Sequence, residues 1–374
     1  MVTTDVTDRP PADGVDMTTT VDTTKLDQLT NQVFADFAAA MTLPLVRLGD
    51  RLGLYRALHE HGPCTAADLA SRTGVHEAVV HEWLANQAAA GYVTLDLGDG
   101  AGDDDRFLLT PEQEAVFVYE DSGACMLAAF QLAAAYTRSE PSVASAFASG
   151  APCPWGDHDH ELFEAVERFY RPAYTASLVD EWIPAIDGAS ERLRQGAVVA
   201  DVGCGHGLST VLMAKAFPTS SFVGIDDHVA SIDRARALAT REGVADRVRF
   251  DVQPTTELTG TFDLIVALDA FHDMGDPERV ATTLRSRLAP GGTVMIVEPF
   301  AADRLTDNLT LLGRAYYAAS TLACTPSALS QSDERPLGAQ AGPARLTRAL
   351  QAGGFTSVRV ATTTPFNLVL EAKP

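Results

Sequence analysis

Cysteine, positive charge and long apolar runs are all scarce in this chain of 374 residues. Its 5 cysteines are scattered along the sequence and form no C-x-x-C pair. Such a set excludes a disulfide framework and a zinc module and is typical of a reducing compartment, so we expect a cytoplasmic protein. The N-terminus has neither the basic segment nor the apolar core of a signal peptide. The longest apolar stretch, residues 123–136, is too short to cross a bilayer.

The shortage of positive charge limits which binding partners are expected. The chain has 28 Lys and Arg against 50 Asp and Glu, a formal net charge of −22. This balance opposes binding to nucleic acids and to anionic membranes, because both depend on basic contacts. Between Thr73 and Asp105 there is no Lys or Arg at all, and the acids in this window are Glu77, Glu82, Asp96, Asp99, Asp103, Asp104 and Asp105.

That acidic window lies inside a predicted winged helix. Residues 65–68, Thr-Ala-Ala-Asp, predict a capping box, and a second helix is expected over 76–90. Two short strands, 92–97 and 106–109, then enclose a Gly- and Asp-rich loop at 98–105. A recognition helix without basic residues lacks the usual phosphate contacts, so we interpret this element as a dimerisation and scaffolding unit.

The regions around the winged helix complete an N-terminal domain over residues 25–190. Residues 1–24 have little to bury, and we expect a disordered tail. Apolar residues at helical spacing from Leu26 to Leu58 predict two helices separated at Pro44. Residues 122–190 are alanine-rich and helical, and a few of their aromatic side chains, Tyr170 among them, are expected to line a substrate pocket. We expect a homodimer formed through residues 26–130.

Residues 197–207 are the most informative segment. A short apolar run ends in Asp201, and a glycine turn with Gly203, Gly205 and Gly207 follows at once. The third glycine comes one place too early for the G-x-G-x-x-G spacing of dinucleotide sites. Asp201 would repel a diphosphate but suits a cation, and S-adenosylmethionine carries an ammonium and a sulfonium and no phosphate. The segment resembles the first motif of class I S-adenosylmethionine-dependent methyltransferases.

The rest of the C-terminal half supports a doubly wound sheet. A second strand, 221–225, ends in Asp226 and Asp227, about 20 residues beyond the glycine loop, where an acid accepts hydrogen bonds from ribose hydroxyls. The cofactor-binding residues expected are Asp201, Gly203, Cys204, Gly205, Asp226, Asp227, Gln253 and Asp269.

Strands are predicted at 197–201, 221–226, 247–252, 262–268, 293–298, 355–362 and 365–371, with helices between the first five. The predicted fold class is therefore α/β, with a class I (Rossmann-like) methyltransferase domain over residues 191–374 and a mostly helical winged-helix domain before it.

Chemistry is expected where the fourth and fifth strands end. The fourth strand leads into His272 and Asp273, and residues at this edge face the methyl donor in a doubly wound sheet. A neutral imidazole there can accept a proton from a hydroxyl, phenol or amine, so His272 is the candidate general base. Asp273 and Glu298, the latter at the end of the fifth strand, complete the catalytic candidates.

Residues 271–276, Phe-His-Asp-Met-Gly-Asp, are similar to the Leu-His-Asp-Trp-x-Asp stretch of dimeric plant-type small-molecule O-methyltransferases, with Met274 in place of the tryptophan. In that family the histidine is the general base. The chain looks closer still to an actinobacterial, mycobacterial-type branch of uncharacterised methyltransferases. That likeness rests on residues 201–206, 271–277, 297–299, 313–317, 320–321, 324–326 and 329–331. The resemblance implies methyl transfer from S-adenosylmethionine to a small molecule, and the aromatic helical domain suggests an apolar or aromatic one.

Residues 300–331 form an insertion between the fifth strand and the closing hairpin. Apolar residues recur in it at helical spacing, which predicts an ordered helical segment. Its function is left open between a lid over the pocket and simple packing on the helical domain. The substrate-facing candidates are Tyr316, Tyr317 and Ser320, together with Tyr170.

Three other functions stay open at this point. The first is an enzyme that uses S-adenosylmethionine without methylating, which the presence of His272 disfavours. The second is a cofactor-sensing transcriptional regulator, which the acidic winged helix disfavours. The third is a metal-assisted C-methyltransferase with His272 and Asp273 as ligands. Two neighbouring ligands are too few to define a metal site, and His158 and His160 are interpreted as a polar turn, so we expect no metal.

Overall fold

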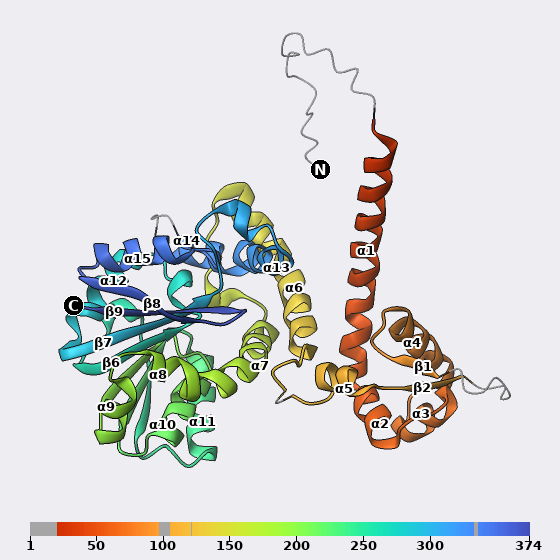
Figure 1. Ribbon diagram of the computed structural model, residues 1–374, viewed down its shortest axis with the longest axis horizontal. Helices are drawn as coiled ribbons and strands as arrows, with labels where there is room; N and C mark the ends of the chain where they lie inside the picture. The colour runs from red at the N-terminus through yellow and green to blue at the C-terminus, as the bar shows by residue number, and fades with distance from the viewer. Residues whose placement is uncertain (1–20, 97–104, 121, 333–335) are drawn as a thin grey trace, which may run out of the picture.

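The computed structural model describes residues 21–96, 105–120, 122–332 and 336–374 (Figure 1). Most of the predicted tail and of the Gly- and Asp-rich loop lies outside these residues. The first helix, α1 (Thr23–Arg51), is capped by the Asp22 side chain, so the last two residues of the expected tail are helical. Among the described residues no helix combines the length and apolarity that crossing a membrane requires. All 5 cysteines are free thiols.

The predicted helix break at Pro44 is wrong. Helix α1 runs through Pro44, and α2 (Leu54–His61) begins only after Gly53. Gly53 has φ 68°, a left-handed conformation that glycine adopts without the Cβ clash other residues suffer, and this reverses the chain. Proline has a helical φ and costs α1 only one backbone hydrogen bond, so the helix accommodates it.

The winged-helix order of elements is the one predicted. The capping box at Thr65 and Asp68 starts α3 (Ala66–Thr73), and α4 (Glu77–Ala89) follows. Strands β1 (Thr94–Asp96) and β2 (Arg106–Leu108) pair antiparallel, and α5 (Pro111–Phe117) comes next. Tyr55 joins the elements, because its ring lies 5.0 Å from that of Trp83 and 4.9 Å from that of Phe117.

A helical connection links this unit to the sheet (Figure 1). It consists of α6 (Leu127–Ser149), a short turn η1 (Trp155–Asp157), α7 (His160–Ser177), a π-helical turn η2 (Leu178–Trp182), α8 (Ile183–Ala185) and α9 (Ala189–Gln195). Helices α6 and α7 pack against each other. His158 is buried, with Nδ1 3.0 Å from the hydroxyl of Ser139 on α6, whereas the His160 side chain is 90% exposed. The two histidines therefore do not converge on a common ligand.

Seven strands form the second domain: β3 (Val198–Val202), β4 (Ser221–Asp226), β5 (Val248–Val252), β6 (Phe262–Leu268), β7 (Leu288–Pro299), β8 (Ser357–Thr363) and β9 (Asn367–Lys373). Their order is β5-β4-β3-β6-β7-β9-β8. The first five are parallel and β9 is antiparallel to both neighbours, so the closing hairpin inserts β9 beside β7 and leaves β8 at the edge.

Helices cover both faces of this sheet, as the predicted fold class requires. One apolar core packs α8 to α11 on one face, where α10 is Leu208–Ala216 and α11 is Val229–Arg241. The other core packs α12 (Pro277–Ser286) and α15 (Pro343–Ala352) on the opposite face. The helix predicted between β5 and β6 is absent from the described chain. Only a one-turn 3-10 helix, η3 (Thr255–Glu257), joins these strands, because the connection is too short for more.

The insertion after β7 is ordered, as predicted. It contains η5 (Leu305–Asn308), α13 (Leu311–Ala319), a π-helical turn η6 (Ser320–Cys324) and α14 (Thr325–Gln331). Turn η6 packs on α6. Gln331 accepts a hydrogen bond from the Gly275 amide at 3.1 Å and donates one to the Asp273 carbonyl at 3.1 Å. The insertion is thus fastened to the loop that follows β6.

Candidate active site

One cavity lies where the carboxyl ends of the parallel strands face α6, α7 and the insertion. Its sheet side is lined by Gly203, Cys204, Gly205, Asp226, Asp227, Gln253, Asp269, His272 and Asp273. Its helical side is lined by Tyr136, Trp155, Phe163, Tyr170, Tyr174, Tyr316, Cys324 and Ser327. Among the described lining residues there is no Lys or Arg, and the acidic ones are Glu167, Asp226, Asp227, Asp269 and Asp273. The cavity therefore favours a cation over an anion.

The glycine loop after β3 brings backbone close to the cavity. Gly203 has φ 70°, and a Cβ on it would come 2.6 Å from the Ala270 Cβ. Only glycine fits this close approach between two strand ends. The backbone amides of Gly203 and Cys204 both donate to the carbonyl of Ile225, at 2.8 and 3.0 Å, which ties the loop to the end of β4.

The two acids predicted beside this loop differ in position. Asp226 lines the cavity and accepts hydrogen bonds from the backbone amides of Gly205 and His228, each at 3.0 Å. Burial raises the pKa of Asp226. Asp201 is buried behind the loop and is not among the lining residues; its Oδ2 accepts from the Ser209 and Thr210 hydroxyls at 2.6 Å. Its Oδ1 has no hydrogen-bond partner, and burial raises its pKa to about 6.

Asp269 is in an unusual state. It is the only non-glycine residue with positive φ, 50°, among the described residues, and such strain is concentrated at functional sites. The Tyr174 hydroxyl donates to its Oδ2 at 2.9 Å, and the Asn367 amide donates to its Oδ1 at 3.2 Å. Burial, aided by the nearby Glu298 charge, raises the pKa of Asp269 to about 8. A cationic ligand would favour its ionised form.

His272, Asp273 and Glu298 meet at the other end of the cavity. Glu298 is 2% exposed; its Oε2 lies 2.5 Å from Nδ1 of His272, and its Oε1 accepts from the Phe271 amide at 3.0 Å. Nε2 of His272 lies 3.0 Å from Oδ1 of Asp273. Burial alone would lower the pKa of His272, but the charges of Asp273 and Glu298 outweigh it and raise this pKa well above its usual value.

The predicted substrate-facing residues divide in two. Tyr170 and Tyr316 line the cavity, and the Tyr316 hydroxyl donates to the Phe366 carbonyl at 3.1 Å. Tyr317 and Ser320 are not among the lining residues. The Ser320 hydroxyl is occupied within the insertion, because it accepts from the Ala339 amide at 3.1 Å.

Several lining residues were not predicted as site residues. Tyr174 holds Asp269 from a position far away in the sequence, and Cys324 and Ser327 come from the insertion. Asn367, which also holds Asp269, is not a lining residue and was not predicted either. The sequence signal for Cys324 was its place in a segment that resembles methyltransferases, but nothing in that segment indicates which side chain faces the cavity.

Comparisons with known proteins agree with this geometry. Residues 193–352 match the family model described as "Methyltransferase domain". A probable chloroplastic tocopherol O-methyltransferase of Oryza sativa subsp. japonica is 31% identical over 196 residues, which are 46% of this chain and 52% of that protein. The first curated relatives are matched over 24%, 52% and 43% of their lengths, so the chain spans about half of them or less. The match confirms the S-adenosylmethionine-dependent methyltransferase domain that the glycine motif predicts for this part of the chain.

Solved structures resemble nearly the whole chain. Mitomycin 7-O-methyltransferase has a TM-score of 0.69 at 18% identity, covering 94% of this chain and 100% of that one. Human N-acetylserotonin methyltransferase, solved with S-adenosylmethionine, has a TM-score of 0.67 at 16% identity, covering 95% of this chain and 98% of that one. At these identities the likeness shows the fold, and it confirms the predicted fold class.

Proposed function

We propose that this protein transfers the methyl group of S-adenosylmethionine to an oxygen of a small apolar or aromatic molecule, with His272 as general base. The observation that carries the proposal is the cavity itself. It joins the glycine loop and Asp226 to His272, whose Nδ1 is hydrogen-bonded to Glu298 outside the lining, and no described lining residue is Lys or Arg.

The cofactor lies along the sheet edge in this proposal. Both oxygens of Asp226 are oriented by backbone amides, and their remaining lone pairs accept the ribose hydroxyls. Asp227 and Gln253 lie beside the adenosine. Asp269 ionises next to the positive charge of the cofactor, which offsets the cost of burying its carboxylate. A nucleotide phosphate would meet carboxylates here and no Lys or Arg among the described lining residues.

The transfer step follows from the geometry of His272. Glu298 accepts a hydrogen bond from Nδ1–H, so neutral His272, which lines the cavity, carries its lone pair on Nε2. The acceptor hydroxyl gives its proton to Nε2 as its oxygen bonds to the methyl carbon. The sulfonium–methyl bond breaks, leaving S-adenosylhomocysteine. The carboxylates of Asp273 and Glu298 stabilise the imidazolium that forms.

The acceptor class is inferred from the helical wall. Tyr136, Phe163, Tyr170 and Trp155 line the cavity opposite the sheet. Burial raises the pKa of both Tyr136 and Tyr170, so these phenols stay neutral and present mainly apolar rings. A flat, apolar or aromatic acceptor suits this wall.

The proposal includes a cytoplasmic homodimer that does not bind nucleic acid. Helix α1 projects from the rest of the chain (Figure 1), and its exposed apolar side chains are Leu26, Leu29, Val33, Phe34, Phe37, Met41, Leu48 and Leu52. Most of them are three, four or seven residues apart, so they form one stripe that a second copy of the chain covers. The absence of Lys and Arg between Thr73 and Asp105 supports a scaffolding role for the winged helix.

Cofactor binding is the first test. Asp226→Ala removes a buried, hydrogen-bonded carboxylate, which costs roughly 1.5–3 kcal/mol, or about 10- to 150-fold in affinity for S-adenosylmethionine by calorimetry. Asp251→Ala is the matched control, because Asp251 is the last residue but one of the neighbouring strand β5 and is not among the cavity residues. Equal affinity in Asp226→Ala and wild type would remove Asp226 from the cofactor site.

A further inference from the structure

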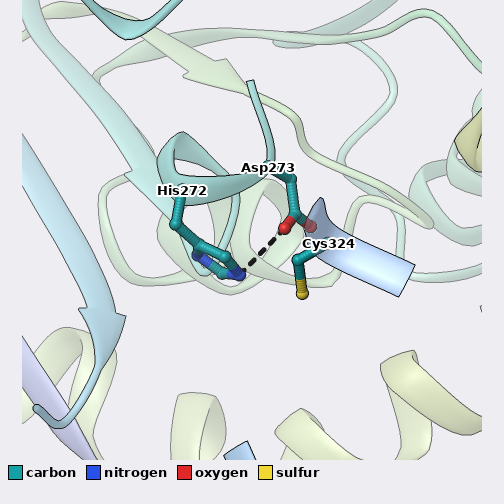
Figure 2. Close-up of side chains that lie close together, drawn as sticks. All are labelled: His272, Asp273 and Cys324. Carbon is teal, nitrogen blue, oxygen red and sulfur yellow. Dashed lines mark ion pairs between the residues drawn. The ribbon is translucent and has the colours of Figure 1, made fainter. Parts of the chain in front are cut away.

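A third side chain joins His272 and Asp273 from a distant part of the sequence. Cys324, at the end of the π-helical turn η6, lies beside the 3-10 turn η4 (Phe271–Asp273) (Figure 2). One ligand atom from each of the three residues lies within 4.8 Å of the others. His272 is 3% exposed and Cys324 is 6% exposed, and all three residues line the cavity.

The atoms that meet here are electron-pair donors. Glu298 is acceptor-only when ionised and lies 2.5 Å from Nδ1 of His272, so Nδ1 carries a proton and the neutral ring presents a lone pair at Nε2. Oδ1 of Asp273 lies 3.0 Å from that nitrogen, and while His272 is neutral no hydrogen-bond donor satisfies this buried oxygen. A nitrogen, an oxygen and a sulfur thus face one another. Either a proton on Nε2 of His272 or a bound metal cation can offset the carboxylate charge among them.

We propose that His272, Asp273 and Cys324 form a binding site for one divalent cation of the zinc class. Imidazole, carboxylate and thiolate together are the ligand types that Zn²⁺ and its close analogue Co²⁺ accept, whereas Mg²⁺ and Ca²⁺ prefer oxygen alone. The described lining residues include no Lys or Arg that could neutralise the nearby carboxylates. A bound divalent cation would neutralise negative charge that otherwise only a protonated His272 offsets.

The surroundings fit this ion. Tetrahedral zinc, with bonds of about 2.0–2.3 Å, holds its ligand atoms roughly 3.3–3.8 Å apart. Nε2 and Oδ1, 3.0 Å apart, need to separate by about 0.3 Å, and the thiol needs to approach by about 1 Å or less from its outer limit of 4.8 Å. In many zinc sites a carboxylate bound to the other ring nitrogen orients the metal-binding histidine, and Glu298 has this position at Nδ1 of His272. The fourth position opens into the cavity.

The bound ion inhibits methyl transfer. The ion binds the Nε2 lone pair of His272, which would otherwise take the proton from the hydroxyl that is methylated. It also lies where the oxygen of that hydroxyl binds. This consequence rests on the proposed function, whereas the binding of the ion does not.

Cobalt titration of the full-length protein, freed of metal by a chelator and kept reduced, tests the site directly. We expect one Co²⁺ per chain, a thiolate-to-cobalt charge-transfer band, and displacement by Zn²⁺. Cys324→Ser should lose the band and at least 100-fold in Co²⁺ affinity, because loss of even an outer partner costs 10–100-fold. Cys125→Ser, a change at a thiol outside the cavity, should keep both.

Inhibition by Zn²⁺ is then measured for each variant against its own uninhibited rate. Wild type and Cys125→Ser should be inhibited in competition with the acceptor, and Cys324→Ser should need at least 100-fold more Zn²⁺. No stoichiometric Co²⁺ binding, or binding that Cys324→Ser leaves intact, would overturn the site. Stimulation of turnover by the ion would overturn the inhibitory role. Cobalt binding in a protein that methylates nothing would leave the site standing and refute the proposed function instead.

Discussion

At the scale of single residues, His272 has the position of a general base, but its neighbours favour its protonated form. Its Nδ1 is held by Glu298, which leaves Nε2 toward the cavity, but Asp273 lies 3.0 Å from that same nitrogen. The two carboxylates favour the imidazolium, which cannot accept a proton. Methyl transfer therefore depends on the fraction of His272 that is neutral, and this fraction grows with pH.

The pH dependence of turnover follows from this competition. Because the pKa of His272 is raised, the acid limb of the rate profile should lie well above the usual histidine range. Asp273→Asn removes one charge that raises this pKa, so the acid limb should move to lower pH by about 1 unit or more. The measurement is kcat against pH for both proteins, with Asp157→Asn as a control that changes an acid outside the cavity lining. An acid limb that stays in place in Asp273→Asn would separate Asp273 from the base.

The positions of the candidate residues were predictable where they follow from strand order. Asp226 and Glu298 stand at the ends of predicted strands and His272 follows another, and parallel strands bring their carboxyl ends to one edge. The partners of Asp269 were not predictable. Tyr174 and Asn367 reach it from α7 and β9, and no local pattern encodes a contact between segments so far apart. The same holds for Cys324, whose orientation depends on the packing of η6 against α6.

At the scale of elements, the pattern of apolar residues predicts the strands, whereas the helix ends depend on individual residues such as glycines. The strands of the sheet were predicted to within a few residues at most ends because alternating or continuous apolar runs mark them. The main errors concern connections. Pro44 was interpreted as the end of a helix, although α1 continues through it. The helix boundary lies instead at Gly53, which the prediction did not consider.

The role of Gly53 gives a test at this scale. An added Cβ meets nothing within 4 Å, so Gly53→Ala changes only the backbone conformation, which is left-handed at φ 68°. The free energy of unfolding should fall by about 1–2 kcal/mol in urea titrations. Gly123→Ala is the matched control, because Gly123 is equally open but has no positive φ, and it should be nearly neutral. Equal stability of the two variants would contradict a strained link between α1 and α2.

At the scale of the whole molecule, the chain is a helical domain followed by a methyltransferase domain, with the cavity between the sheet edge and α6 and α7. Fold class was predictable because alternating strands and helices leave few arrangements. The actinobacterial branch that the motifs resemble, the identity of the acceptor and the assembly state stay predictions.

Assembly is tested on α1. The proposed homodimer buries the apolar stripe of this helix, in which Phe37 is 57% exposed within one chain. Phe37→Asp places a charge in the interface, so light scattering at micromolar concentration should show a dimer for wild type and a monomer for the variant. Leu305→Asp is the control, since Leu305 is 63% exposed but lies in the insertion. A monomeric wild type, or a Phe37→Asp dimer as tight as wild type, would refute assembly through α1.

The most direct measurement of the proposed methyl transfer follows a labelled methyl group from S-adenosylmethionine to a panel of phenols and apolar hydroxy compounds. Wild type should transfer the label to at least one of them, and His272→Ala should be about 10²–10⁴-fold slower while binding the cofactor with unchanged affinity. His160→Ala, which alters a histidine whose side chain is 90% exposed, should match wild type in both. Undiminished transfer by His272→Ala would contradict the base, and no transfer by cofactor-saturated wild type to any acceptor would contradict the methyltransferase itself.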